Sequence, residues 1–295
     1  MKIKEGMRRW LFIILLVFGI IGPTAFWFLY EDDGRLKIAF LNVGQGDAAF
    51  IETPNHYKIL VDAGPPNKSV LRSLNEILPF WDHDIDMAII THAHDDHFGG
   101  YLYLLGRYNI KNFVIGNSFD NSSSYKELLS KIEQNKINII KPGQEDIVVD
   151  GVKIDFLLTR GEGYKGDNQN NKSIVFRLSY KDIDTLFVGD AEKELEEALL
   201  NNKDNIFDSE IIKAGHHGSD TSSSESFIDK VLPKIAIISV AKVNKFGHPS
   251  LMTIRRFERL GIKFYRTDQD GSIILKTDGY SLFKGGACLI GCSSL

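Results

Sequence analysis

Cysteine is scarce in this sequence. The 295 residues contain two cysteines, Cys288 and Cys292, and both lie in the C-terminal tail. Neither lies near a cluster of histidines, so we assign them no catalytic role. Their spacing permits a small disulfide loop without requiring one. The sequence also lacks a G-x-S-x-G motif and a nucleotide-binding glycine loop, so neither serine-hydrolase nor phosphate-loop chemistry has support.

Internal repeats and low-complexity stretches are absent as well. The length suits one large α/β domain or at most two small ones, and the hydrophobic and charged contents of 43% and 25% are those of a globular protein. The formal net charge is -4, although the first nine residues are strongly basic. The acidic body argues against a broad nucleic-acid-binding surface and leaves room for a local basic groove.

Residues 10–30 form an uncharged apolar run, preceded by the basic residues 1–9 and followed by an acidic linker at 31–36. A bilayer is crossed by about 20 apolar residues in a helix, so this run predicts one N-terminal transmembrane anchor. The basic flank places residues 1–9 in the cytoplasm and the body outside the cytoplasmic membrane. A cleaved signal peptide is the alternative, but no small-x-small cleavage site follows the run.

The body alternates short apolar runs with turn residues, which predicts strands, and four stretches with helical spacing lie between them. The strands are expected at 36–43, 47–53, 58–64, 87–92, 112–117, 138–143, 152–159, 173–190, 210–214, 234–240, 263–267 and 272–277. The helices are expected at 69–78, 98–108, 192–201 and 250–261. This pattern favours sheets covered by helices. The tail at 279–295 shows no clear pattern.

The chemistry is concentrated in the segment THAHDDHFGG at 91–100. His92, His94, Asp96 and His97 follow directly after a buried-type strand. Imidazole and carboxylate groups suit zinc, manganese or iron. In a loop, the first two histidines can bind one ion while Asp96 and His97 reach a second ion about 3.5–4 Å away. The alternative is a solvated turn that happens to be rich in histidine.

These residues resemble the H-x-H-x-D-H signature of the metallo-β-lactamase superfamily. Further motifs follow in the order LNVGQGDA, LVDAG, THAHDDHFGG, DNQNNKS, FVGDAE, KAGHHGS and KFGHPS. Together they resemble the soluble hydrolase domain of ComEC-type DNA-uptake proteins and its stand-alone relatives. The resemblance implies an αββα sandwich over residues 37–278, with residues 279–295 as a separate tail.

The resemblance also implies a role for each matching residue. The implied metal ligands are His92, His94, Asp96, His97, Asp190, His217 and His248. His92 and His94 would hold the first ion, Asp96 and His97 the second, and Asp190 would bridge both.

Other implied roles lie around these ligands. Asp62 would orient a ligand by hydrogen bonding. Many members of the superfamily carry a histidine between the signature and the bridging aspartate, and here none lies between His97 and His216. We therefore take His217 as the ligand and His216 as contacting substrate, with the reverse assignment open.

The expected activity is hydrolysis by a hydroxide that two divalent ions, Zn²⁺ or Mn²⁺, activate. Asp96 and His216 are the expected catalytic residues, and Asn171, Ser219 and Lys245 are candidates to bind substrate. A phosphodiester is the favoured substrate, with DNA as the leading candidate. The alternatives are an envelope phosphodiesterase acting on esters such as phosphorylcholine, and a non-catalytic anchored binding module. One spanning segment cannot encode a full uptake channel.

The C-terminal half has a local positive bias that either forms a phosphate-binding rim or presents a solvated face. The basic residues concerned are Lys213, Lys242, Lys245, Arg255, Arg256, Arg259, Lys263 and Arg266.

Overall fold

A computed structural model describes residues 9, 10, 12, 16, 33–143, 145–157 and 166–292. Residues 1–34 form one unit by their contacts and residues 35–295 form another. The expected anchor at 10–30 falls almost entirely outside the described residues. Among those that are described, no helix combines the length and the apolar character needed to cross a bilayer.

The body contains two large β-sheets. The strands of the nine-stranded sheet, in spatial order, are β18 (Ala287–Ile290), β17 (Leu282–Lys284), β16 (Ile273–Thr277), β1 (Leu36–Phe40), β2 (Ala49–Glu52), β3 (Lys58–Val61), β5 (Met87–Ile90), β7 (Asn112–Ile115) and β8 (Asn138–Ile140). Strands β3, β5, β7 and β8 run parallel, and the other pairs are antiparallel.

The strands of the seven-stranded sheet, in spatial order, are β15 (Lys263–Arg266), β14 (Ile235–Ile238), β13 (Ile211–Lys213), β12 (Ile183–Phe187), β11 (Val175–Tyr180), β10 (Val152–Leu157) and β9 (Ile147–Val149). Strands β12 to β15 are parallel. A separate two-stranded sheet joins β4 (Asp84–Ile85) to β6 (Asn109–Ile110).

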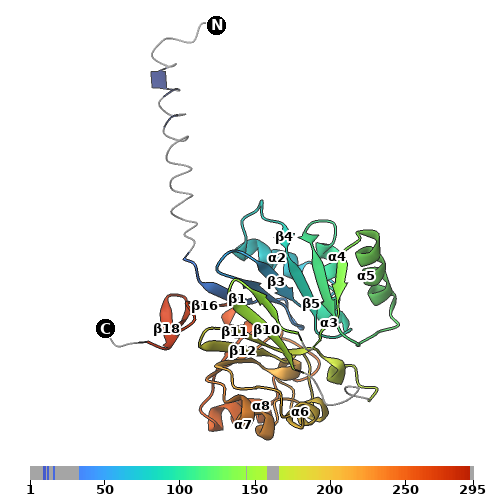
Figure 1. The fold of residues 1–295 in the computed structure, drawn as a ribbon, viewed down its shortest axis with the longest axis vertical. Coiled ribbons are helices and arrows are strands. Elements are labelled where there is room, and N and C mark those ends of the chain that lie inside the picture. Colours follow the sequence, from blue (N-terminus) through green and yellow to red (C-terminus); the bar gives the residue numbers. More distant parts are fainter. Residues whose placement is uncertain are drawn as a thin grey trace. The chain divides into compact units, whose positions relative to one another are not determined.

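Helices cover the outer face of each large sheet (Figure 1). The helices against the nine-stranded sheet are α2 (Ser69–Ile77), α3 (Asp95–Phe98), α4 (Tyr101–Leu104) and α5 (Ser123–Gln134). The helices against the seven-stranded sheet are α6 (Lys193–Leu200), α7 (Glu225–Val231) and α8 (Leu251–Arg259). The remaining short helices are α9 (Thr267–Asp270) and the 3₁₀ turns η1 (Asn170–Lys172) and η2 (Gly215–Gly218).

Three hydrophobic clusters explain why these layers hold together. Successive side chains of a strand point to opposite faces, and β1 shows this clearly. Leu36, Ile38 and Phe40 pack between the two sheets, while Ala39 and Leu41 pack under the helices of the first layer. A third cluster lies between the second sheet and its helices. The expected αββα sandwich is therefore confirmed.

The C-terminal tail differs from the expectation. Strands β17 and β18 pair with each other and continue the nine-stranded sheet beyond β16, so the fold does not end at residue 278. Leu282 is fully buried in the core between the sheets, which explains why this short segment is ordered. Cys288 and Cys292 form a disulfide that closes a loop at the end of this hairpin.

Candidate metal centre

Five loops at one end of the sandwich bring polar side chains together. Asp47 precedes β2, Asp62 follows β3, His92 follows β5, Asp190 follows β12 and His217 follows β13. Because the parallel strands of both sheets end here, residues far apart in the chain become neighbours. All five residues are buried.

The first half of the centre is built by β5 and the turn after it. The Nε2 atom of His92 lies 3.0 Å from Nδ1 of His94 and 3.8 Å from Oδ2 of Asp190. Burial, together with the nearby His97, holds the pKa of His92 well below its ordinary value, so this ring is neutral. Ligand atoms of His92, His97 and Asp190 lie within 4.8 Å of one another, as a metal ion requires, whereas no such group among the described residues includes His94.

The second half shares Asp190 with the first. Oδ2 of Asp190 lies 3.2 Å from Nε2 of His97 and 3.6 Å from Nε2 of His217. The same nitrogen of His217 lies 3.3 Å from Oδ2 of Asp96. Asp96 and His97 were expected on a loop, but they lie in the first turn of α3. The backbone is extended at His94 and becomes helical at Asp95, and this change aims the two halves of the motif at different points.

Oxygen atoms behind two of the histidines fix the orientation of their rings. Oδ2 of Asp62 lies 2.8 Å from Nδ1 of His97. Nδ1 of His217 lies 3.1 Å from the carbonyl oxygen of Ser239, its hydrogen-bond partner, and 3.2 Å from Oδ1 of Asp47. Each ring therefore presents Nε2 to the centre, which is the usual arrangement behind metal-binding histidines. The sequence analysis placed Asp62 in this role but missed Asp47. The signal was present, since Asp47 lies in the motif LNVGQGDA.

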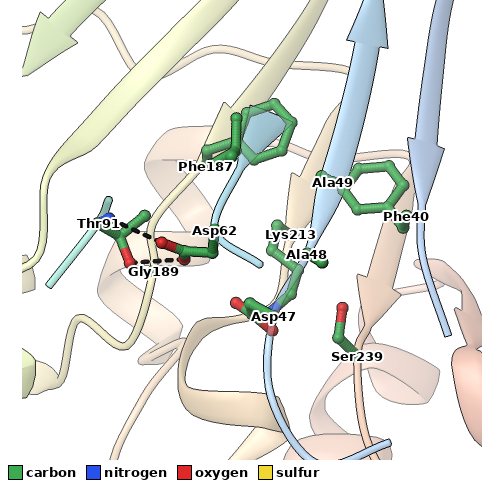
Figure 2. A pocket seen from close by; sticks show the side chains of 11 residues that line it. Phe40, Asp47, Ala48, Ala49, Asp62, Thr91, Phe187, Gly189, Lys213 and Ser239 are labelled. Atoms are coloured by element: carbon green, nitrogen blue, oxygen red, sulfur yellow. Dashed lines mark hydrogen bonds and ion pairs between the residues drawn. The ribbon is translucent and has the colours of Figure 1, made fainter. Parts of the chain in front are cut away.

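Asp47 has a second partner that sequence reasoning misplaced. Nζ of Lys213 lies 2.8 Å from Oδ2 of Asp47 and donates to the carbonyl oxygen of Ala214. Lys213 is only 3% exposed, so it does not belong to a phosphate-binding rim. Figure 2 shows Lys213, Asp47 and Ser239 beside a cavity of about 10 Å³, which holds no more than about one water molecule.

The buried carboxylates of the centre favour positive charge beside them. Burial alone would lower the pKa of His217, but the carboxylates of Asp190 and Asp47 outweigh it and raise the pKa to about 10. His97 behaves in the same way, with Asp190 and Asp62 as the cause. Burial opposes ionisation of Asp190, but His97 and His217 keep its pKa well below the ordinary value. Asp190 and Asp47 therefore stay ionised and attract positive charge to the histidines.

Two buried polar atoms of the centre lack a hydrogen-bond partner, and metal ions would supply the missing interaction. Nε2 of His97 and Oδ1 of Asp190 are buried and have no hydrogen-bond partner. Such atoms are costly unless a further partner is present. Four overlapping groups of described His and Asp residues have ligand atoms within 4.8 Å of one another. The donors are nitrogen and carboxylate oxygen, which suit zinc and manganese.

His216 and His248 lie at the edge of the centre. The side chain of His216 is 24% exposed, with Nδ1 3.0 Å from Oε1 of Glu192 and Nε2 3.8 Å from Oδ2 of Asp190. The ring centre of His248 lies 5.2 Å from that of His216 and 6.4 Å from that of His217. His248 belongs to none of the four groups found among the described residues.

The backbone of the His-His segment is itself unusual. His216 and His217 have φ angles of 45° and 53°, in the left-handed region that costs about 1–2 kcal/mol per residue. Gly46 permits another close approach, because a Cβ atom there would lie 2.2 Å from the carbonyl oxygen of Asp96. Strain of this kind persists where the surrounding structure holds it, often at functional sites.

Comparison with known proteins agrees with this geometry. Residues 41–242 match the family model of the Metallo-beta-lactamase superfamily. The chain is 30% identical over 281 residues to ComE operon protein 3 of Bacillus subtilis (strain 168), an alignment that covers 88% of this chain. The chain belongs to the metallo-β-lactamase superfamily.

A second relative is similar over nearly the whole chain. Competence protein ComA of Neisseria gonorrhoeae is 27% identical over 285 residues, which cover 95% of this chain. Both alignments span 36% of the relatives' own length, so this chain corresponds to about a third of each.

Solved structures support the fold alone. The metallo-beta-lactamase fold protein YhfI from Bacillus subtilis superposes with a TM-score of 0.53 at 11% identity, covering 82% of this chain and 100% of that one. CmlA, a diiron beta-hydroxylase from Streptomyces venezuelae, gives a TM-score of 0.53 at 14% identity, covering 79% of this chain and 52% of that one.

Two of the three candidate substrate-binding residues, Asn171 and Ser219, are buried and interact with neighbouring residues of the fold. Asn171 is buried, accepts a hydrogen bond from the backbone of Glu192 and donates to Glu194. Ser219 is also buried, and its hydroxyl lies 3.0 Å from that of Thr221. Lys245 is exposed on the loop that carries His248.

Proposed function

We propose that this protein is a metal-dependent phosphodiesterase that cleaves DNA outside the cytoplasmic membrane. The observation that carries the proposal is the pair of ligand clusters that share Asp190, with Asp96 on the open side. The side chain of Asp96 is 34% exposed, whereas those of Asp190 and His217 are 2% exposed. The names of the relatives, a ComE operon protein and a competence protein, favour DNA as the substrate.

His92 and His94 would hold one divalent ion, Asp96, His97 and His217 a second, and Asp190 would contact both. Such a pair of ions supplies a hydroxide near neutral pH and stabilises the negative charge that develops on the phosphate. Zinc and manganese both suit these ligands.

The protein's own side chains then position and protonate the substrate. Asp96 stays ionised because His217 and His97, against the effect of burial, keep its pKa below the ordinary value. It can therefore orient a nucleophilic water. His216 is partly exposed, and its Nδ1 lies 3.0 Å from Oε1 of Glu192, so we assign Nε2 the role of stabilising the phosphate or protonating the leaving oxygen.

We further propose that residues 10–30 anchor the chain in the cytoplasmic membrane with the hydrolase domain outside. The uncharged length of this run and its basic flank support this topology. Added protease should digest the body in intact spheroplasts if the topology is correct. Protection of the body until the cells are lysed would contradict it.

The activity is tested with the full chain in detergent, given zinc or manganese. Single-stranded DNA, double-stranded DNA and bis-p-nitrophenyl phosphate are the substrates. His94→Ala and Asp190→Ala remove ligands, and His83→Ala is the matched control because His83 is exposed and lies against Tyr108. We expect metal-dependent DNA cleavage that both ligand variants lose and the control retains.

Two other outcomes would favour a different function. Cleavage of the small diester without DNA cleavage would favour an envelope phosphodiesterase. Metal binding without turnover of any substrate would favour an anchored binding module.

A further inference from the structure

The loop between β14 and α8 exposes apolar side chains beside the metal centre. This loop, residues 241–250, carries His248 at its inner side. Phe246 is 57% exposed and Val243 is 89% exposed. Burying a Phe side chain is worth about 1.5–3 kcal/mol, so the exposed ring of Phe246 offers apolar surface that a ligand can cover.

The side chain of Asn244 holds the loop in this conformation. Its Nδ2 donates to the carbonyl oxygens of Ala241 and His248, and its Oδ1 accepts from the backbone N–H groups of Phe246 and His248. All the hydrogen-bonding groups of one amide are thus used inside the loop. The exposure of Phe246 is therefore built into the loop.

The ring of Phe246 extends the metal centre outwards. It stacks on His248 at a centroid distance of 5.7 Å and an interplanar angle of 26°. His248 in turn lies against His216, whose Nε2 faces Asp190. Nζ of Lys245 lies 5.1 Å from the centre of the Phe246 ring. The rings of His216, His248 and Phe246 therefore follow one another outwards from Asp190. The outermost ring, that of Phe246, is exposed and lies next to the ammonium group of Lys245.

The structure separates the basic residues of this half into two sets. Those with partners inside the fold are Lys213 with Asp47, Arg256 with the carbonyls of Ser222 and Ser223, Arg259 with Glu225, Lys263 over Tyr265, and Arg266 with Asp268. Those exposed on or just after the loop are Lys242, Lys245 and Arg255. From 241 to 257 the sequence contains no acidic residue. The segment that carries the exposed ring therefore has positive charges and no negative ones, and Asp190 and Asp220 are the carboxylates that act on the neighbouring His248.

We propose that Phe246 is a stacking platform for an unpaired nucleobase next to the scissile phosphate, with Lys245 and Lys242 pairing with the flanking phosphates. The proposal rests on the proposed function and adds that the preferred strand is single. Inside a duplex, neighbouring base pairs cover both faces of each base, so away from a duplex end a flat ring at the surface can stack only on an unpaired base. Aromatic rings and cations along a groove are how proteins bind single strands without reading sequence.

The test compares two strands that differ only in their bases. The full chain in detergent, with zinc or manganese, is given a short oligothymidylate and a strand of the same length whose nucleotides lack bases. The values of kcat/KM are measured for the wild type, Phe246→Ala and Phe246→Trp. Phe80→Ala is the matched control, because Phe80 is an exposed phenylalanine in the loop that precedes β4.

We expect Phe246→Ala to lower kcat/KM on the oligothymidylate by roughly 5- to 100-fold, which is the effect of losing one stacked base. Most of this change should appear in KM. The same variant should leave the rate on the abasic strand unchanged, and Phe246→Trp should restore the rate on the oligothymidylate. Phe80→Ala should behave as the wild type.

The possible failures are distinguishable. If Phe246→Ala lowers kcat/KM equally on both strands, or on neither, Phe246 is not a stacking platform. The proposed function still stands in that case, provided that the wild type cleaves DNA. Cleavage of duplex DNA at least as fast as the single strand also overturns it. A wild type that cleaves no nucleic acid with either metal refutes the proposed function, and the platform falls with it.

Discussion

Nζ of Lys213 and Oδ2 of Asp47 lie 2.8 Å apart in a buried ion pair behind His217. The other oxygen of Asp47 faces Nδ1 of His217. Burial alone would raise the pKa of Asp47, but Lys213 and His217 lower it to about 2. Lys213 therefore keeps Asp47 anionic, and Asp47 together with the carbonyl oxygen of Ser239 keeps Nε2 of His217 directed at the metal centre.

Lys213→Met should destabilise the protein strongly, because it leaves the carboxylate of Asp47 buried without its cation. Breaking a buried pair in this way costs about 3–5 kcal/mol. Denaturant unfolding measures the change. The control is Lys234→Met, whose partner is Glu210 and whose side chain is 60% exposed, with an expected cost of about 0–1 kcal/mol. Equal effects of the two substitutions would show that Asp47 does not depend on Lys213.

Asp62→Asn should weaken metal binding while the protein stays folded. The Asp62 carboxylate lies 2.8 Å from Nδ1 of His97 and accepts hydrogen bonds from the backbone and hydroxyl of Thr91. Asparagine keeps the shape and tolerates the φ of 55° at this position. Loss of an outer carboxylate typically lowers metal affinity about 10–100-fold.

Competition against a chromophoric chelator measures this affinity. Asp182→Asn, at an exposed position of the β11–β12 hairpin, is the control and should bind metal normally. Unchanged affinity in Asp62→Asn would remove Asp62 from any role behind His97.

Spacing in the chain predicted only the site residues that lie close together in it, whereas Asp62, Asp190 and His217 were predicted through the family resemblance. His92, His94, Asp96 and His97 fall within one turn after a buried strand, so their cluster is visible as a spacing. Asp47 and Lys213 are 166 positions apart, and they become partners only because the loop before β2 in one sheet meets the end of β13 in the other. The buried character of Lys213 was likewise invisible, because a lysine in a sequence reads as a surface residue.

The sequence likewise predicted some secondary-structure elements and missed others. Strands and amphipathic helices with strong periodicity, such as α6 and α8, were expected near their observed positions. Helix α5 was not, because its residues are mostly polar and only Tyr125, Leu128 and Ile132 are buried. The hairpin of β17 and β18 was missed for a related reason, since its strands are short and gain order by pairing with β16.

In chelator, the stability of the metal-free protein should fall as pH rises from about 6.5 to about 10. The unfolded histidine has a pKa of about 6.5, and the folded His217 has a pKa raised to about 10. A raised folded pKa stabilises the protein fully below the unfolded value, and this stabilisation is lost as pH rises through the folded value.

Thermal unfolding across this range measures the effect. With zinc present, stability should instead rise with pH over the lower part of the range, because the ion displaces the protons from the histidines. His217→Asn in chelator should show a shallower fall than the wild type. An identical fall in the variant would assign the pH dependence to other groups.

His217→Ala and His248→Ala should have different effects on metal content. Nε2 of His217 lies within 3.6 Å of Asp96 and Asp190, so its loss should remove one tightly bound ion. His248 lies outside the clusters, and burial together with His216 and His217 lowers its pKa to about 4. Its ring is therefore neutral at pH 7 and serves as the inner wall under Phe246. Elemental analysis after dialysis should find two ions per chain in His248→Ala and about one in His217→Ala. Loss of an ion from His248→Ala, with full retention in His217→Ala, would reverse the two assignments and place His248 among the ligands, as its motif first implied.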